Sequence, residues 1–194
     1  PTSTRQIVLN TTRDVLADKE VRQALQHATN KRTISEGIFY GLEQPADTLF
    51  AKTVPYCDID LEPYAYDVEL AQSMLDEAGW VVGSDKIREK DGQKLNIDLL
   101  YNSDSVTEKA IAEYLQSEYQ KIGIALNIHG EEEQSYRDNM KAGNFDMVFN
   151  ICWGTPYDPQ SSLAAMRAPV YGDYAAQLGL EDKADIDQAI TDIL

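Results

Sequence analysis

Alternating strand and helix patterns over residues 95–152 constrain the fold of this chain more than any other feature. Leu95 to Tyr101 alternates as a strand, Ser105 to Ile122 has the apolar spacing of a helix, and Ile124 to Ile128 is a second strand. The next helix ends at Gly143, where glycine is preferred, and the short apolar run Phe145 to Cys152 is a third strand. A β-α-β-α-β order requires crossover helices and permits parallel strands, so the sequence predicts an α/β fold.

Helix start and stop signals organise the first forty residues. Arg5 to Asn10 is a short strand, and Asp18 is placed to cap a helix that continues to about Ala28. The apolar positions of that helix share one face, at Val21, Ala24, Leu25 and Ala28. Thr33 is then expected to cap a shorter helix that runs through Phe39.

A long proline-containing loop, Gln44 to Pro63, separates these helices from the next one. Asp67 is the expected cap of that next helix, and Gly79 is its end. Its inner face should carry Leu70, Ala71, Met74, Leu75 and Ala78. Val81 to Gly92 is expected to be a charged connection that turns at Asp91 and Gly92.

The two ends of the chain suggest a piece of a longer protein. The chain begins at Pro1, and Ile186, Ile190 and Ile193 recur at helical spacing up to Leu194. We therefore expect further residues before Pro1 and after Leu194. The lack of a signal peptide consequently does not indicate the cellular compartment of the protein.

The candidate binding site is the loop that follows the third strand. Trp153 to Pro159 contains two prolines and a glycine, which stop regular structure directly after the strand. Ligands of open α/β sheets bind outside the carboxyl ends of strands, where Trp153 and Tyr157 could present flat faces and polar tips. The alternative, which the residues leave open, is that both rings only plug the loop against the core.

Charge and composition exclude several classes of function. The chain has 33 Asp and Glu against 17 Lys and Arg, a net charge of −16. Phosphate binding needs clustered basic residues, so a nucleic-acid partner and an anionic membrane surface are both disfavoured.

Catalytic and metal-binding motifs are also missing from the sequence. His27 and His129 adjoin no nucleophile and have no ligand spacing, so we expect neither an enzyme nor a protein-held metal. A hydrolase remains only a distant alternative. Glu131, Glu132 and Glu133 are better explained by the favourable field at a helix start. The pairing of Cys57 with Cys152 stays open.

Several segments resemble the peptide/nickel-type extracellular solute-binding proteins of ABC importers. They are Val21 to Leu25 with Asn30 to Arg32, Tyr66 to Ala71 with Leu75 to Trp80, Gln120 to Ile124, and Gly143 to Met147. Val68 replaces the proline that is usual in the second of these. Others are similar to the nickel branch of the family: Ala46 to Ala51, Ile87 to Gln93, Trp153 to Pro159, Met166 to Pro169, and Gly179 to Lys183.

The resemblance implies a periplasmic-binding-protein-like lobe, with a mixed sheet flanked by helices. Residues 1–194 would form most of the C-terminal lobe of a two-lobed protein that closes on its cargo, with the first lobe and the C-terminal end absent. It implies no cofactor, a monomer, and importer permease subunits as partners. It also implies a periplasmic location, or an extracellular one with a lipid anchor.

The cargo implied by the nickel branch is nickel or a related transition metal, carried as a small chelate. Trp153, Tyr157 and Tyr136 would line the cleft. Tyr171 stands where that branch has a histidine, so direct ligation of the metal by the protein is not expected. The alternative cargo is an oligopeptide or dipeptide. Peptide-binding relatives place an acid just after this turn, where this chain has Pro156 and Tyr157.

Overall fold

The computed structural model describes residues 3–152 and 160–193, and it confirms the α/β fold with a mixed sheet flanked by helices. The N-terminal half contains β1 (Thr4–Leu9), α1 (Asp14–Ala17), α2 (Lys19–His27), α3 (Lys31–Gly37), α4 (Val68–Glu77), β2 (Val81–Val82), β3 (Arg88–Lys90) and β4 (Gln93–Lys94). The C-terminal half contains β5 (Asn96–Asn102), α5 (Val106–Gln120), β6 (Ala125–Glu131), α6 (Glu133–Ala142), β7 (Met147–Cys152), α7 (Gln160–Ala165), α8 (Gly172–Leu178) and α9 (Lys183–Ile193).

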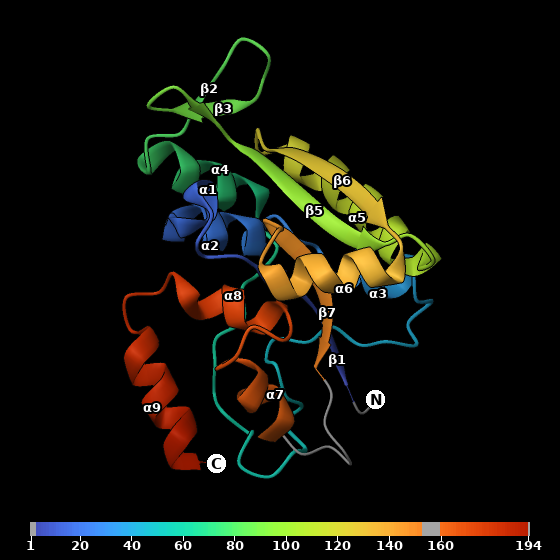
Figure 1. Cartoon of the computed structure of the whole chain (residues 1–194). Helices are drawn as coiled ribbons and strands as arrows, with labels where there is room; N and C mark the ends of the chain where they lie inside the picture. The colour runs from blue at the N-terminus through green and yellow to red at the C-terminus, as the bar shows by residue number, and fades with distance from the viewer. Residues whose placement is uncertain (1–2, 153–159, 194) are drawn as a thin grey trace.

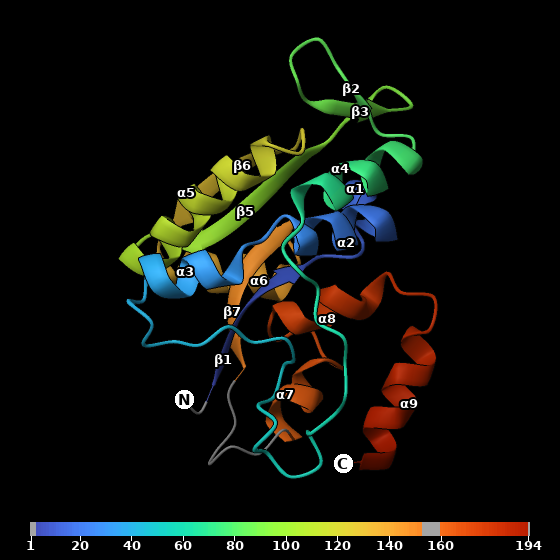
Figure 2. The same ribbon diagram turned by 180° about the vertical axis from the view of Figure 1, so that it is seen from behind.

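The main sheet has the strand order β1-β7-β5-β6. β5 is parallel to β6 and to β7, whereas β1 is antiparallel to β7. The crossover helix α5 connects β5 to its neighbour β6. The crossover helix α6 then connects β6 to β7, which lies on the other side of β5. The two crossover helices therefore cover opposite faces of the sheet, as Figures 1 and 2 show.

Each face of the sheet packs its own hydrophobic cluster. The larger one joins α1, α2, α4 and α5 to one face, with Ile97, Leu99, Met147 and Phe149 among its buried strand residues. The smaller one lies under α6 and α8 and contains Val8, Leu100, Tyr136, Met140, Phe145, Val148 and Ala175. The strand residues of the two clusters alternate along β5 and β7, because successive side chains of a strand point to opposite faces.

Most of the expected helix boundaries are confirmed by their caps. The side chains of Asp18, Asp67 and Ser105 accept hydrogen bonds from the first turns of α2, α4 and α5. Gly143 ends α6 in the left-handed region, with φ of 71°. The expectation that Thr33 caps α3 is wrong, since Asn30 is the cap and accepts from the Thr33 backbone N–H at 3.1 Å.

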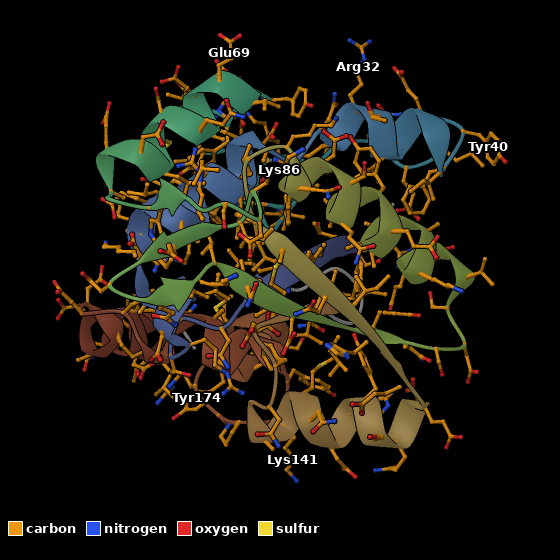
Figure 3. The ribbon with its side chains drawn as sticks, turned by 90° about the horizontal axis from the view of Figure 1, so that it is seen from above. Arg32, Tyr40, Glu69, Lys86, Lys141 and Tyr174 are labelled. Carbon is orange, nitrogen blue, oxygen red and sulfur yellow. The ribbon has the colours of Figure 1, made fainter. Side chains whose placement is uncertain are left out.

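Charged side chains at helix ends extend into solvent, as Figure 3 shows for Glu69 and Lys141. Glu69 lies in the first turn of α4 and Lys141 in the last turn of α6. Each charge has the sign that the helix macrodipole favours at that end.

Two further expectations need correction. Leu70, expected on the inner face of α4, is 42% exposed, while Ala71 and Leu75 on that face are fully buried. Residues 81–92 are not only a connection, because β2, β3 and β4 form a small antiparallel sheet. Its tight turn is at Asp91 and Gly92, as expected, with φ of 52° and 80°.

The segment between α3 and α4 contains no helix or strand, as expected for residues 44–63. Tyr40 lies near its start and is 85% exposed, pointing away from the fold in Figure 3. At the far end of the segment, the Tyr66 hydroxyl donates to Glu118 on α5 at 2.7 Å. Within the described ranges, none of the helices has the length and apolar character needed to span a membrane.

Candidate functional site

The carboxyl ends of the parallel strands define the candidate site. β5, β6 and β7 end at Asn102, Glu131 and Cys152, on the same edge of the sheet. The antiparallel β1 begins at this edge too, with Thr4 opposite Cys152, and Figure 1 shows the start of β1 beside the end of β7. The connections that leave β5 and β6 run to opposite faces, and ligands of α/β sheets bind at such a switch point.

Two of the four residues proposed from the sequence fall outside the described residues. Trp153 and Tyr157 belong to 153–159, directly after β7. The side chain of Cys152 is likewise outside the described part of the chain, whereas Cys57 carries a free thiol. The structural account of the site therefore starts from Tyr136 and Tyr171.

Tyr136 lies on α6 and points down onto the sheet. It is 7% exposed, and its hydroxyl donates to the backbone carbonyl of Phe149. The β5–β7 pairing consists of Leu99 with Met147 and Leu100 with Val148, so Phe149 lies just beyond the last pair. The Tyr136 hydroxyl thus donates to a backbone carbonyl at the point where β5 and β7 diverge. Burial raises the pKa of Tyr136, so the phenol stays protonated as a donor.

Tyr171 is half-buried and packs against the same small cluster as Tyr136. It is the N-cap residue of α8, and Gly172 and Asp173 follow it in the first turn. The structure therefore brings Tyr136 and Tyr171 to one face of the sheet, at the cluster that contains Val8 and Val148. Tyr136 comes from α6 and Tyr171 from the start of α8, two helices that pack on the same face of the sheet.

The glutamates at this edge are each held by neighbouring side chains or backbone. Asn139 Nδ2 donates to Glu131 at 2.7 Å, and the side-chain amide of Asn102 donates to Glu133. The Asn102 backbone N–H donates to Glu108 at 2.9 Å, and burial raises the pKa of Glu108. Glu132 is the N-cap residue of α6 and Glu133 lies in its first turn, as expected for a helix start, whereas Glu131 is the last residue of β6.

Among the described residues, no group of three His, Cys, Asp or Glu side chains is placed to hold a metal ion. His27 Nδ1 lies 2.8 Å from the Ala65 carbonyl oxygen. His129 Nε2 lies 3.2 Å from an Asp98 carboxylate oxygen. The two imidazoles serve different local contacts and do not converge.

A pocket of about 450 Å³ lies elsewhere, along the outer side of β1. Its lining comes from β1, α2, the segment between α3 and α4, and the α7–α8 region, and includes Gln6, Leu9, Arg22, Tyr64, Asp173 and Gln177. Neither Tyr136 nor Tyr171 lines it. We do not assign the cargo to this pocket, because it follows an edge strand rather than the carboxyl ends of the parallel strands.

Sequence reasoning missed three polar residues that link β1, β7 and α8. Asp173 accepts hydrogen bonds from Gln6 Nε2 at 2.7 Å and from Asn150 Nδ2 at 2.6 Å. Gln6 and Asn150 face each other across the β1–β7 register. Nothing in the spacing of these residues signals the contact, because the pairing of two distant strands creates it.

Comparison with known proteins gives matches over the whole chain. The chain is 40% identical, over 195 residues, to the nickel-binding periplasmic protein of Escherichia coli, covering 100% of this chain and 37% of the relative. The solved structure of NikA from Brucella suis in complex with Fe(III)-EDTA superposes with a TM-score of 0.94 at 47% identity, covering 100% of this chain and 39% of that one.

Peptide-binding relatives match as well, at lower identity. The oligopeptide-binding protein AppA of Bacillus subtilis is 30% identical over 145 residues, which is 71% of this chain and 26% of the relative. The chain thus spans between a quarter and two fifths of the length of these relatives.

Residues 1–173 match the family described as bacterial extracellular solute-binding proteins, family 5 Middle. The match covers most of the chain, and the shared fold agrees with it. The chain belongs to the family 5 bacterial extracellular solute-binding proteins.

Proposed function

We propose that the protein containing this chain is the substrate-binding component of an ABC importer and captures nickel, or a related transition metal, as a small chelate. The observation that carries the proposal is the end-to-end identity of 40% with a nickel-binding periplasmic protein. It is supported by the TM-score of 0.94 with a relative solved with a metal chelate.

In this proposal, residues 1–194 are most of the C-terminal lobe and supply one side of a cleft that a second lobe completes. The protein is a carrier, it works as a monomer with the importer's permease subunits, and it holds no cofactor. Its location is the periplasm, or the cell exterior with a lipid anchor. Trp153, Tyr157, Tyr136 and Tyr171 contribute to the wall of the cleft.

Chelation of the cargo agrees with the chemistry of the described residues. Soft and borderline divalent metals favour imidazole and thiolate ligands. The two imidazoles here lie in separate contacts, with Ala65 and with Asp98. A metal that arrives with its own small-molecule ligands needs no such cluster from the protein, and aromatic faces and hydroxyls are suited to hold the chelate.

The direct test uses the full-length protein, since one lobe gives only part of the site. Metal analysis and mass spectrometry of co-purified material should find nickel, or a related metal, with a small chelator. Calorimetry should show tight binding of a Ni(II)–histidine chelate and weak binding of the bare ion. Tight stoichiometric uptake of bare nickel that depends on His27 or His129 would contradict the proposal.

The wall residues are tested by paired measurements of chelate affinity and melting temperature. Tyr157→Phe should weaken binding by about 0.5–1.5 kcal/mol, the net worth of one hydrogen bond, with little change in melting temperature. Trp153→Ala should cost more, because a flat apolar face is lost. If both variants lose stability while the affinity of the folded protein is unchanged, the rings are core plugs.

A peptide carrier is the second candidate, favoured by the relatedness to AppA. Oligopeptides titrated into the same full-length protein distinguish the two. Peptide binding in the micromolar range or tighter, without binding of metal chelates, would replace the proposed cargo while leaving the carrier class intact. Hydrolysis of the bound peptide would point to the distant alternative, an enzyme.

A further inference from the structure

The first turn of α8 is fixed on the sheet by a close backbone approach. A Cβ on Gly172 would lie 3.0 Å from Val148 Cγ1 and 3.5 Å from atoms of Phe145 and Val8. The backbone of this turn therefore rests directly on side chains of β1 and β7. The residue before Gly172 is Tyr171, whose main-chain position is set by the same contact.

Asp173 joins this turn to both strands. Its two carboxylate oxygens accept from Gln6 Nε2 at 2.7 Å and from Asn150 Nδ2 at 2.6 Å. Asn150 is only 9% exposed, and its own side-chain oxygen accepts from the Ile151 backbone N–H at 2.9 Å. The chain of hydrogen bonds thus runs from α8 through both strands to the last residues of β7.

The partners of Asp173 are unusual for a carboxylate in this environment. Burial raises the pKa of Asp173, while the hydrogen bonds from Gln6 and Asn150 lower it. In the described ranges, its hydrogen-bond partners are neutral amides, and no lysine or arginine forms an ion pair with it. A half-buried charge without a cation contributes little stability, because desolvation offsets its hydrogen bonds. Its more important effect is to fix the position of α8 relative to β1 and β7.

We infer that Asp173 is a positioning residue for the cargo cleft: by tying the first turn of α8 to β1 and β7, it holds Tyr171 in place on this face of the sheet and so sets the affinity for the cargo. The inference rests on the proposed function, in which Tyr171 belongs to the cleft wall. Asp173 itself need not touch the cargo.

The test exchanges the carboxylate of Asp173 and the amide of Asn150, which form one hydrogen bond. In Asp173→Asn, one of the two acceptor oxygens becomes an NH2 donor, so the side chain can accept from Asn150 or from Gln6 but not from both. In Asn150→Asp, two carboxylates face each other. The double variant Asp173→Asn with Asn150→Asp restores a donor and an acceptor: Asn at 173 donates to Asp at 150 and still accepts from Gln6. Asp182→Asn, on the exposed surface, is the control for loss of one negative charge.

Affinity for a Ni(II)–histidine chelate is measured by calorimetry on the full-length protein, with the melting temperature of each variant. Each single substitution should weaken binding about tenfold, the equivalent of one lost hydrogen bond, and the double variant should return to within about threefold of wild type. The control should match wild type. Unchanged affinity in Asp173→Asn, or a folded double variant as weak as the single ones, would overturn the inference.

A second cycle asks whether Asp173 acts through Tyr171. In a Tyr171→Ala background, Asp173→Asn should cause less than about a twofold further loss, because the group that it positions is already absent. An equal tenfold loss in both backgrounds would show that Asp173 does not act through Tyr171. Wild-type protein that binds no metal chelate would instead overturn the proposed function, an outcome distinct from chelate binding that Asp173 does not affect.

Discussion

Substitution of Gly179 by alanine tests how tightly the C-terminal end of α8 is docked. Gly179 is the C-cap residue of α8, and its backbone N–H donates to Thr11 Oγ1 at 2.9 Å. A Cβ at this position would lie 2.2 Å from the Thr11 carbonyl oxygen and 2.6 Å from its carbonyl carbon. Both neighbours are backbone atoms, so rotation of a side chain cannot relieve the clash.

Thr11 is held too firmly to retreat. It is 4% exposed, and its backbone N–H and its hydroxyl each lie 3.2 Å from the Ala175 carbonyl oxygen. Overpacking at a well-packed position costs about 1–3 kcal/mol, and loss of the Thr11 hydrogen bond adds about 1 kcal/mol. Restriction of the unfolded chain by alanine offsets about 0.4–1 kcal/mol. We expect Gly179→Ala to lower the free energy of unfolding by about 1–3.5 kcal/mol.

The assay is urea unfolding of the full-length protein, compared with a second glycine substitution. A Cβ on Gly37 in α3 would meet open space, and the φ of this glycine is not positive, so Gly37→Ala should be neutral or stabilising by up to about 1 kcal/mol. Wild-type stability in Gly179→Ala would refute the docking of α8 on Thr11. Equal losses in both variants would show that the effect is not the clash.

Two further predictions concern buried polar contacts. Arg88→Met should destabilise the protein by about 2–4 kcal/mol in chemical unfolding, because the carbonyls of Ile122 and Trp80 lose guanidinium donors at 2.8 and 2.6 Å. Asp76→Asn, which removes the ion-pair partner of Arg88, should cost under about 1 kcal/mol, since the Asp76 side chain is 64% exposed. Burial alone would raise the pKa of Asp18, but hydrogen bonds, including one from the Trp80 indole, lower it below 3.8. The stability that the ionised Asp18 contributes is therefore present above the unfolded-state pKa and is lost as the pH falls. Asp18→Asn removes this contribution, so the melting temperature of the variant should fall less steeply below pH 4.

The helix boundaries were predictable because caps are local chemistry. Asp18, Asp67 and Ser105 each precede an apolar-periodic run, and each accepts from a backbone N–H within three residues. Asn30 and Thr33 show the limit of this signal. Both are capping residue types at the start of one helix, and only the backbone conformation selects Asn30.

The errors have equally physical causes. Leu70 lies in the first turn of α4, at a position that turns away from the core even though its apolar side chain fits the pattern. The strands of the small sheet over residues 81–94 are only two or three residues long, too short for a period of two to be seen. Pairing with neighbours, not local preference, makes them strands.

The edge of the sheet where the parallel strands end was predictable, but the contacts around it were not. The rule that ligands bind at the carboxyl ends of strands led to the edge where β5, β6 and β7 end. The contact between Gln6 and Asp173 spans 167 residues of sequence, and no pattern within one segment reports it. It depends on β1 entering the sheet antiparallel to β7, a pairing that the β-α-β order leaves undetermined.

That antiparallel strand also explains why the polar contacts gather where they do. β1 runs opposite to its neighbour, so its first residues meet the last residues of β7, and Gln6 faces Asn150. Near the same edge β7 has diverged from β5, and the Tyr136 hydroxyl takes the Phe149 carbonyl. A tyrosine hydroxyl thus reaches the Phe149 carbonyl just beyond the β5–β7 pairing, while the amide and carboxylate side chains lie beside the β1–β7 ladder, which continues to Thr4 and Cys152. Under the proposed function, ordering of this edge before binding would lower the entropic cost of holding a small polar cargo.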